Sequence, residues 1–267
     1  MFTALTVAAA LSLAPSQPDA LKLANVRLTV GELGPTRKDA KLLPGDVLFI
    51  GYDIDGLSIE ADGTAKYTMA MEVSDAAGKL IFKQDARELN DFIPLRGNKL
   101  PARAFITIGL DQPAGMYACK ITVTDPKTKG TSTLNEKFEV TKAEFGIVAV
   151  YTSYDELGKY SAPTTGVVGQ TININLSVAT FTRDTKTKQP NVEFLFEVLD
   201  EKGTPTLGQP KKHIQDSGVD EKDGAFGMRF PLFMSRPGKF TARITATDKV
   251  AGKKATYDLP VNVLGTN

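Results

Sequence analysis

The stretch Gly115-Met-Tyr-Ala-Cys-Lys-Ile-Thr-Val-Thr-Asp125 occurs a second time, almost pattern for pattern, as Gly238-Lys-Phe-Thr-Ala-Arg-Ile-Thr-Ala-Thr-Asp248. In both copies apolar residues alternate with residues that are mostly Thr, Lys or Arg. This alternation is typical of a β-strand with one buried face. The chain is therefore a tandem repeat, and this strand is the clearest mark of it.

The repeat extends outward from this strand in both directions. Gly45 and the apolar positions after it match Gly169 and the apolar positions that follow it. The offset between matched positions stays between 122 and 125 residues. Insertions this small fall naturally in loops. We therefore predict one domain over 23–140 and a second over 145–265, joined by the polar linker 141–144. A linker this short favours a fixed angle between the domains.

The fold class follows from the strand patterns within each half. Each half holds about seven short alternating segments separated by turn signals, and neither half shows a sustained 3.6-residue period. These features predict an all-β protein of two tandem antiparallel β-sandwich (Ig-like) domains related by an internal repeat. A barrel is the competing closure. The first strand is expected over 24–30 with Val26, Leu28 and Val30 on one face, and residues 85–100 are expected to be irregular or briefly helical.

A family resemblance is carried by the segments that lead into the repeated strand. Pro113-Ala-Gly-Met-Tyr117 and Arg236-Pro-Gly-Lys-Phe240, each followed by an alternating strand that ends in Thr-Asp, resemble the closing segment of immunoglobulin-like and macroglobulin-like modules in exported bacterial proteins. The resemblance implies a scaffold used for adhesion, spacing or binding, and it implies no site residue. The chain has no cysteine pair and no tryptophan, unlike an antibody-type domain.

Charge and composition narrow the function classes. With 32 basic and 31 acidic residues, the net charge of +1 provides no field that would attract nucleic acid, so no nucleic-acid partner is expected. One histidine and one cysteine allow neither an intramolecular disulfide nor a multi-histidine metal site. We expect no cofactor.

The N-terminal residues 1–14 form an apolar run that is too short to span a bilayer and has the length of a secretory h-region. Small residues stand where a signal peptidase would cut, although no Lys or Arg precedes the run. The pattern predicts a signal peptide over 1–14 and a flexible leader over 15–22, the alternative being an ordinary N-terminus. After cleavage the protein would be secreted or periplasmic, with no segment spanning the membrane.

Two groups of residues are candidate binding sites. Tyr151, Tyr154 and Tyr160 gather near the predicted linker, where an aromatic platform would bind carbohydrate, although core and edge packing explains them as well. The second group consists of four acidic residues that would offer oxygen ligands to Ca²⁺ but lack EF-hand spacing, so a solvated hairpin tip is the alternative: Asp53, Asp55, Glu60 and Asp62.

Two single residues complete the candidates. His213 is the one side chain expected to titrate near neutral pH, but no Gly-x-Ser-x-Gly elbow accompanies it, so an exposed loop histidine is the simpler interpretation. Cys119 lies on the apolar face of the repeated strand, which predicts a buried free thiol.

The sequence therefore favours a secreted, non-enzymatic tandem Ig-like protein that acts as a binding, adhesion or spacer module. Its expected partner is a protein or glycan of the cell envelope. A carbohydrate-binding module that uses the tyrosines near the interdomain joint is one alternative. A hydrolase with a pair of carboxylates is the other, since 31 acidic residues always offer such pairs.

Overall fold

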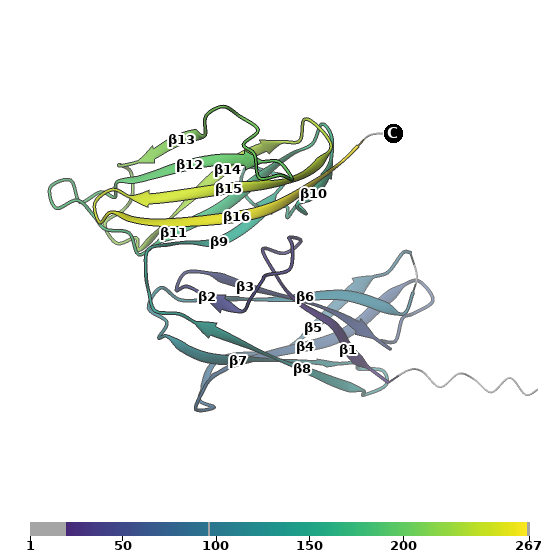
Figure 1. Ribbon diagram of the computed structural model, residues 1–267. Helices are drawn as coiled ribbons and strands as arrows, with labels where there is room; N and C mark the ends of the chain where they lie inside the picture. The colour runs from purple at the N-terminus through teal and green to yellow at the C-terminus, as the bar shows by residue number, and fades with distance from the viewer. Residues whose placement is uncertain (1–19, 96, 266–267) are drawn as a thin grey trace, which may run out of the picture.

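The structure is a computed structural model, and it describes residues 20–95 and 97–265. The predicted signal peptide over 1–14 and most of the leader lie outside the described residues. The described residues contain strands and no helix, so no helix among them could cross a membrane. In Figure 1 the strands form two β-sandwiches that lie one above the other, joined by a short connection at one end.

The first sandwich is formed by eight strands in two sheets. A three-stranded sheet has the order β1-β3-β6, and a five-stranded sheet has the order β2-β8-β7-β4-β5. All neighbours are antiparallel except β2 and β8, which are parallel. The strands are β1 (Lys22–Thr29), β2 (Lys41–Leu42), β3 (Val47–Asp55), β4 (Thr64–Asp75), β5 (Leu80–Phe92), β6 (Lys99–Thr107), β7 (Gly115–Thr124) and β8 (Thr131–Val140).

The second sandwich repeats this topology strand for strand. Its sheets have the orders β9-β11-β14 and β10-β16-β15-β12-β13, and the short β10 is again parallel to the last strand. This arrangement is the Ig-like sandwich that the sequence predicted. The strands are β9 (Gly146–Ser153), β10 (Thr165–Val167), β11 (Thr171–Ala179), β12 (Val192–Leu199), β13 (Lys211–Gln215), β14 (Ala225–Phe233), β15 (Gly238–Asp248) and β16 (Lys253–Leu264).

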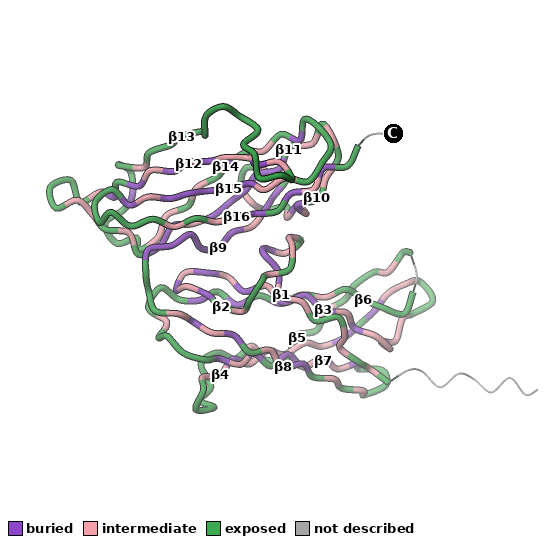
Figure 2. The backbone as a smooth tube through the Cα atoms, viewed as in Figure 1, coloured by how far each residue is buried: buried purple, intermediate pink, exposed green. Residues whose placement is uncertain are grey.

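Each sandwich has its own hydrophobic core between its two sheets, where Figure 2 shows the buried residues. Tyr52 and Phe138 are the largest side chains fully buried in the first core, and Phe194 is the largest in the second. Cys119 lies in the first core on β7, as predicted. Burial, together with a smaller contribution from the nearby Glu136, raises the pKa of its thiol to about 12.

The repeated stretch contributes more than its apolar face. Asp125 and Asp248, which end the two copies, are fully buried, and each accepts three backbone N–H groups. In each case one N–H belongs to the loop after the second long strand, at Ser58 or Thr182, and two belong to the following hairpin. The carboxylate therefore fastens a hairpin of one sheet to a loop of the other.

The corner before β7 differs between the copies. Tyr117 donates its hydroxyl to the Pro113 carbonyl (2.8 Å), which is the tyrosine corner of Ig-like folds. Phe240 stands at the matching place and has no hydroxyl, and the Arg236 guanidinium lies over its ring at 4.9 Å. Both corners hold the entry to the repeated strand, by different interactions.

Two expectations about strands were wrong. The chain over 85–92 belongs to the strand β5 and is neither irregular nor helical. Because β5 is an edge strand exposed on both faces, and two bulges interrupt its pairing with β4, it lacks the alternation that marks a strand. In β1 a bulge at Asn25 (φ 49°) leaves Val26 exposed, and Val30 packs into the core of the second sandwich.

A candidate binding groove at the open side of the sandwich

One side of the first sandwich is open because, among residues 20–95 and 97–265, no strand follows β5 or β6 at the edges of their sheets. The chain passes from β5 directly to β6 in the other sheet, so the two strands border the same gap. In this gap lies a cavity of about 510 Å³. Binding pockets for ligands commonly have 300–1,000 Å³. The cavity is thus large enough to receive side chains of a partner.

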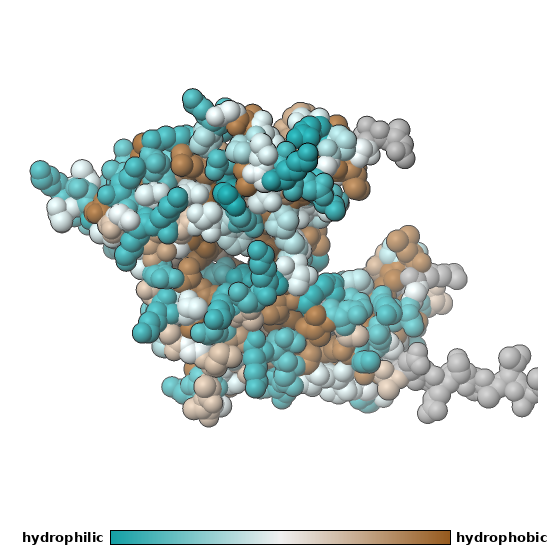
Figure 3. Space-filling view, viewed as in Figure 1, coloured by the Kyte–Doolittle hydropathy of each residue, from teal (hydrophilic) through white to brown (hydrophobic). Residues whose placement is uncertain are grey.

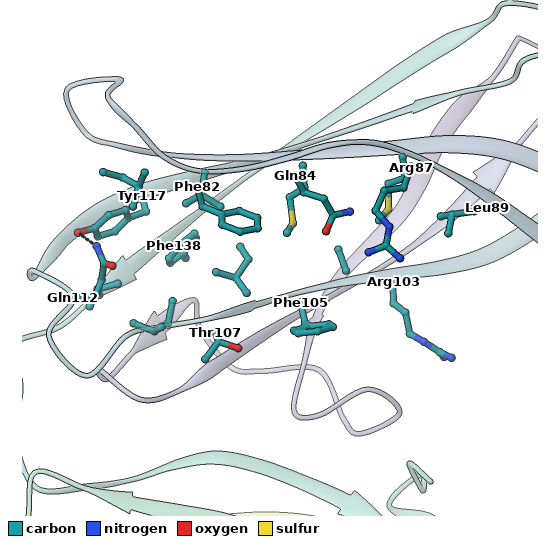
Figure 4. A pocket seen from close by; sticks show the side chains of 18 residues that line it. Phe82, Gln84, Arg87, Leu89, Arg103, Phe105, Thr107, Gln112, Tyr117 and Phe138 are labelled. Atoms are coloured by element: carbon teal, nitrogen blue, oxygen red, sulfur yellow. Dashed lines mark hydrogen bonds between the residues drawn. The ribbon is translucent and has the colours of Figure 1, made fainter. Parts of the chain in front are cut away.

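Side chains from both edge strands line this groove. Phe82, Gln84, Arg87 and Leu89 point from β5 into the gap, as Figure 4 shows, and Ile106 lines it from β6. The floor belongs to the core and is mainly apolar: Met69, Met71, Val73, Tyr117, Phe138 and Val140. An apolar groove of this kind with few polar groups is typical of a binding site.

The groove carries positive charge and no lining carboxylate. Arg87 and Arg103 are the charged residues among those that line it. Arg103 pairs with Glu32, which lies outside the groove. Arg87 has no ion pair with any residue that the structure describes. Its guanidinium is therefore available to a ligand.

A corresponding cavity of about 550 Å³ lies in the second sandwich. It is lined by residues of β12, β14 and the segment after β14, among them Phe196, Phe230 and Phe233. Its edge strand β13 has five residues, whereas β5 has thirteen. Its arginine, Arg236, is stacked on Phe240. The open side is thus a feature of the repeated fold, but the first sandwich presents the longer free edge and the unpaired arginine.

The three tyrosines do not form one platform. Tyr151 is half-buried in β9, with its ring over Gly158 and its Cβ against Gly31 of the first sandwich. Tyr154 and Tyr160 are exposed, and the Tyr154 N–H donates to the Tyr160 carbonyl (2.8 Å). Two of the three tyrosines are therefore exposed in the same loop, and the third contacts Gly31 of the first sandwich.

The loop that carries this pair is built around Asp155. Its carboxylate accepts the N–H groups of Leu157, Lys159 and Tyr160. The hydrogen bond from Tyr160 contributes most to lowering the pKa of this carboxyl, and burial opposes the change. The loop thus holds Leu157 and Tyr160 in the solvent, where they are 76% and 70% exposed.

The four acidic residues predicted as calcium ligands are not brought into one group. Each has its own partner within the first sandwich, and the described residues contain no group of three or more His, Cys, Asp or Glu side chains placed to hold a metal. Asp53 accepts hydrogen bonds from Asn25 and Arg27, Asp55 faces Lys99 at 3.8 Å, Glu60 pairs with Lys127 at 3.0 Å, and Asp62 accepts the Thr64 N–H.

His213 is exposed, as expected, but it lies on the edge strand β13 and not in a loop. Its ring is 6.4 Å from that of Phe194, its partner in the β12 register. No carboxylate is bonded to it among the residues that the structure describes. The arrangement gives His213 no partner for general base catalysis.

The two sandwiches meet in a joint that contains a nearly buried ion pair. Arg37 Nη2 donates to Asp46 Oδ2 (2.8 Å), and Asp46 Oδ1 accepts the backbone N–H of Ala149 in the second sandwich (2.9 Å). A second contact joins the Ser161 hydroxyl to Glu32. Apolar packing accompanies them, since Leu110 and Val148 lie against Gly45. These contacts join the two sandwiches.

Comparison with known proteins adds the following. No family model matches the chain, and no curated protein matches it. Among solved structures it is similar to the C-terminal domain of the Streptococcus pyogenes antigen I/II-family protein AspA, with 9% identity, a TM-score of 0.32, and coverage of 91% of this chain and 100% of that one. The C-terminal domain of the Streptococcus agalactiae protein BspA gives 9% identity, a TM-score of 0.30, and coverage of 91% and 99%.

A red sea bream transglutaminase is also similar, with 12% identity, a TM-score of 0.28 and coverage of 90% of this chain. The chain spans 31% of that protein's length.

Proposed function

We propose that this chain is an exported, non-enzymatic binding module of the cell envelope, in which the groove between β5 and β6 receives an extended segment of a partner protein. One observation carries the proposal: an apolar cavity of about 510 Å³ opens beside two free strand edges. Free edges offer backbone N–H and C=O groups to an added strand, and adjacent pockets select its side chains.

Two further features support a binding role over catalysis. Neither of the two cavities has an Asp or Glu among its lining residues, so neither supplies the carboxylate pair of a glycoside hydrolase. The joint, with Asp46 bridging Arg37 and Ala149, suits a module that holds two surfaces at a set distance. We therefore also propose the domain division at the linker 141–144.

A photo-cross-linking experiment tests the groove. A benzoylphenylalanine placed at Gln84 points into the gap, and the same residue at Lys120, on the exposed face of the same sheet, serves as the control. With an envelope extract of the source organism, we expect covalent adducts of a defined protein from position 84 and none from position 120. Equal adducts at both positions, or none at position 84, would contradict the proposal.

A second candidate function is carbohydrate binding by Tyr154 and Tyr160. It is favoured by their exposure on one loop that Asp155 holds in place. On a glycan array, any bound glycan should be lost in Tyr154→Ala and Tyr160→Ala. It should be retained in Tyr151→Ala, provided that variant folds with the wild-type unfolding midpoint. Binding that survives both exposed substitutions would exclude this site.

A further inference from the structure

The two strand edges of the groove are not equivalent. The strand β6 pairs with β3 over nine consecutive residues without a register shift. The pairing of β5 with β4 is interrupted twice, between Met69 and Met71 and between Val73 and Ser74. Bulges twist a strand and break the regular row of backbone groups that another strand needs. A regular added strand therefore fits along β6 and not along β5.

The direction of the backbone groups on β6 follows from its neighbours. Just beyond β6, Ile108 exchanges hydrogen bonds with Gly45 and Asp46, on the side of β3. Residues at alternate positions of an antiparallel strand turn their N–H and C=O groups to opposite sides. Arg103, Phe105 and Thr107 thus direct theirs to the free edge. Pro101, which has no N–H, shares this parity, as expected for a proline on an edge strand.

The side chains of an added strand would enter the groove at every second position. On one side they meet Ala104 and Ile106 of β6, and on the other Phe82 and Leu89 of β5. These surroundings favour apolar side chains. In the space-filling view, apolar side chains also appear among the hydrophilic ones on the face of the first sandwich that it shows (Figure 3). The three-stranded sheet would thereby gain a fourth strand.

Arg87 sets the charge that such a strand must carry. It points from β5 into the gap between Gln84 and Leu89, and it pairs with no described carboxylate (Figure 4). A charge that points inward at a free edge discourages unspecific strand addition, because burying an unpaired guanidinium is unfavourable. A carboxylate on the incoming strand removes this penalty and forms a charge-assisted hydrogen bond. Arg87 therefore favours acidic segments over neutral or basic ones.

We infer that the groove binds an extended acidic segment of another protein as a fourth strand beside β6. In this segment an Asp or Glu faces Arg87, and apolar side chains two residues before and after it enter the groove. The backbone of the segment pairs with Arg103, Phe105 and Thr107. This inference rests on the proposed function and adds to it the chemistry of the partner and the strand that receives it.

Selection from a displayed library of random heptapeptides tests both the proposed function and this inference, because the library contains short segments of every kind. We expect enriched sequences with one Asp or Glu flanked at two residues' distance by apolar residues. Selection on Arg87→Glu should enrich Lys or Arg at the same place, and the best wild-type peptide should bind this variant about 10-fold to 100-fold more weakly. Arg87 is exposed, so the substitution does not disturb the core. Arg236→Glu, at the corresponding cavity of the second sandwich, is the matched control and should select the wild-type sequences.

Hydrogen exchange measured by mass spectrometry then locates the peptide. Slower exchange is expected over Lys99–Thr107, with a smaller effect over Leu80–Phe92. If no peptide is enriched, both the proposed function and this inference are wrong. If peptides are enriched but lack the acidic residue, or are the same for Arg87→Glu, only the inference is wrong. Protection confined to β5 would reject β6 as the receiving strand.

Discussion

The joint between the sandwiches offers the most direct test of the interactions described above. Asp46→Ala removes a carboxylate that accepts three hydrogen bonds, from Arg37 Nη2 (2.8 Å), from the Val47 N–H (2.8 Å) and from the Ala149 N–H (2.9 Å). The side chains of Arg37 and Asp46 are 14% and 10% exposed. The substitution therefore leaves a nearly buried guanidinium without its counter-ion, and a backbone N–H of the second sandwich without an acceptor.

The magnitude follows from these losses. Removing one partner of a buried ion pair costs about 3–5 kcal/mol, and a hydrogen bond to a charged group contributes about 1.5–3 kcal/mol. Because Arg37 retains a hydrogen bond to the Lys41 carbonyl, we expect a loss of stability at the lower end of the range for a buried ion pair, about 3 kcal/mol. Since about 1.4 kcal/mol is a factor of ten, the joint should open at least 100-fold more often.

Amide exchange of Ala149 measures this opening, and small-angle X-ray scattering reports whether the angle between the sandwiches stays fixed. In Asp46→Ala the Ala149 amide should exchange about 100-fold faster, and the scattering should show a broader range of dimensions. Asp39→Ala is the matched control, because Asp39 is exposed and its carboxylate accepts one bond, from the Lys41 N–H. If both variants exchange alike at Ala149, the ion pair does not hold the joint.

Three further predictions concern stability. Asp125→Ala and Asp248→Ala should each lower the free energy of unfolding by about 2–3 kcal/mol, because each substitution leaves buried backbone N–H groups without an acceptor. Urea titration measures this loss. Burial raises the pKa values of the Cys119 thiol and the Tyr52 hydroxyl to about 12 from 9.0 and 10.0. Their protonated forms thus stabilise the fold fully below pH 9, and this stabilisation should be lost as pH rises toward 12. A free energy of unfolding that stays constant between pH 9 and pH 12 would contradict this prediction. Rapid labelling of Cys119 in the folded chain would also contradict it. Tyr117→Phe should cost about 1 kcal/mol in urea titrations by deleting the corner hydrogen bond.

The repeat made the sandwiches predictable because it fixes the strands with one buried face. Residues such as Tyr117 and Ile244 alternate with polar ones, and both cores contain them at these positions. The groove was not predictable in the same way. The strand β5 is exposed on both faces, and its bulges shift Phe82 and Arg87 out of a common two-residue period. Its composition between Lys83 and Asp91 is as polar as that of a loop.

The residues that form the joint between the sandwiches are not predictable from the sequence, for a different reason. The fixed angle that the short linker predicts stays a prediction. The contacts at Asp46 join the two sandwiches, but the residues that form them have no local pattern. By alternation, Val30 is expected on the same face of the first strand as Val26 and Leu28. The bulge at Asn25 and the turn that begins at Gly31 (φ 65°) instead direct it to the second core. Contacts between repeats depend on such departures from periodicity, and no pattern within one repeat reveals them.

The two copies show why the groove is more than a by-product of the fold. Both sandwiches lack a further strand at the same edges, and both contain a cavity there. If the opening served only to end the sheets, the two copies would be expected to protect it alike. The second copy shortens its edge strand to five residues and stacks Arg236 on Phe240. In the first copy the edge strand β5 has thirteen residues, and the unpaired Arg87 points from it into the gap. A long edge with an inward charge prevents unspecific pairing and still accepts a strand that neutralises the charge. On the proposed function, the first sandwich is therefore the copy that recognises the partner.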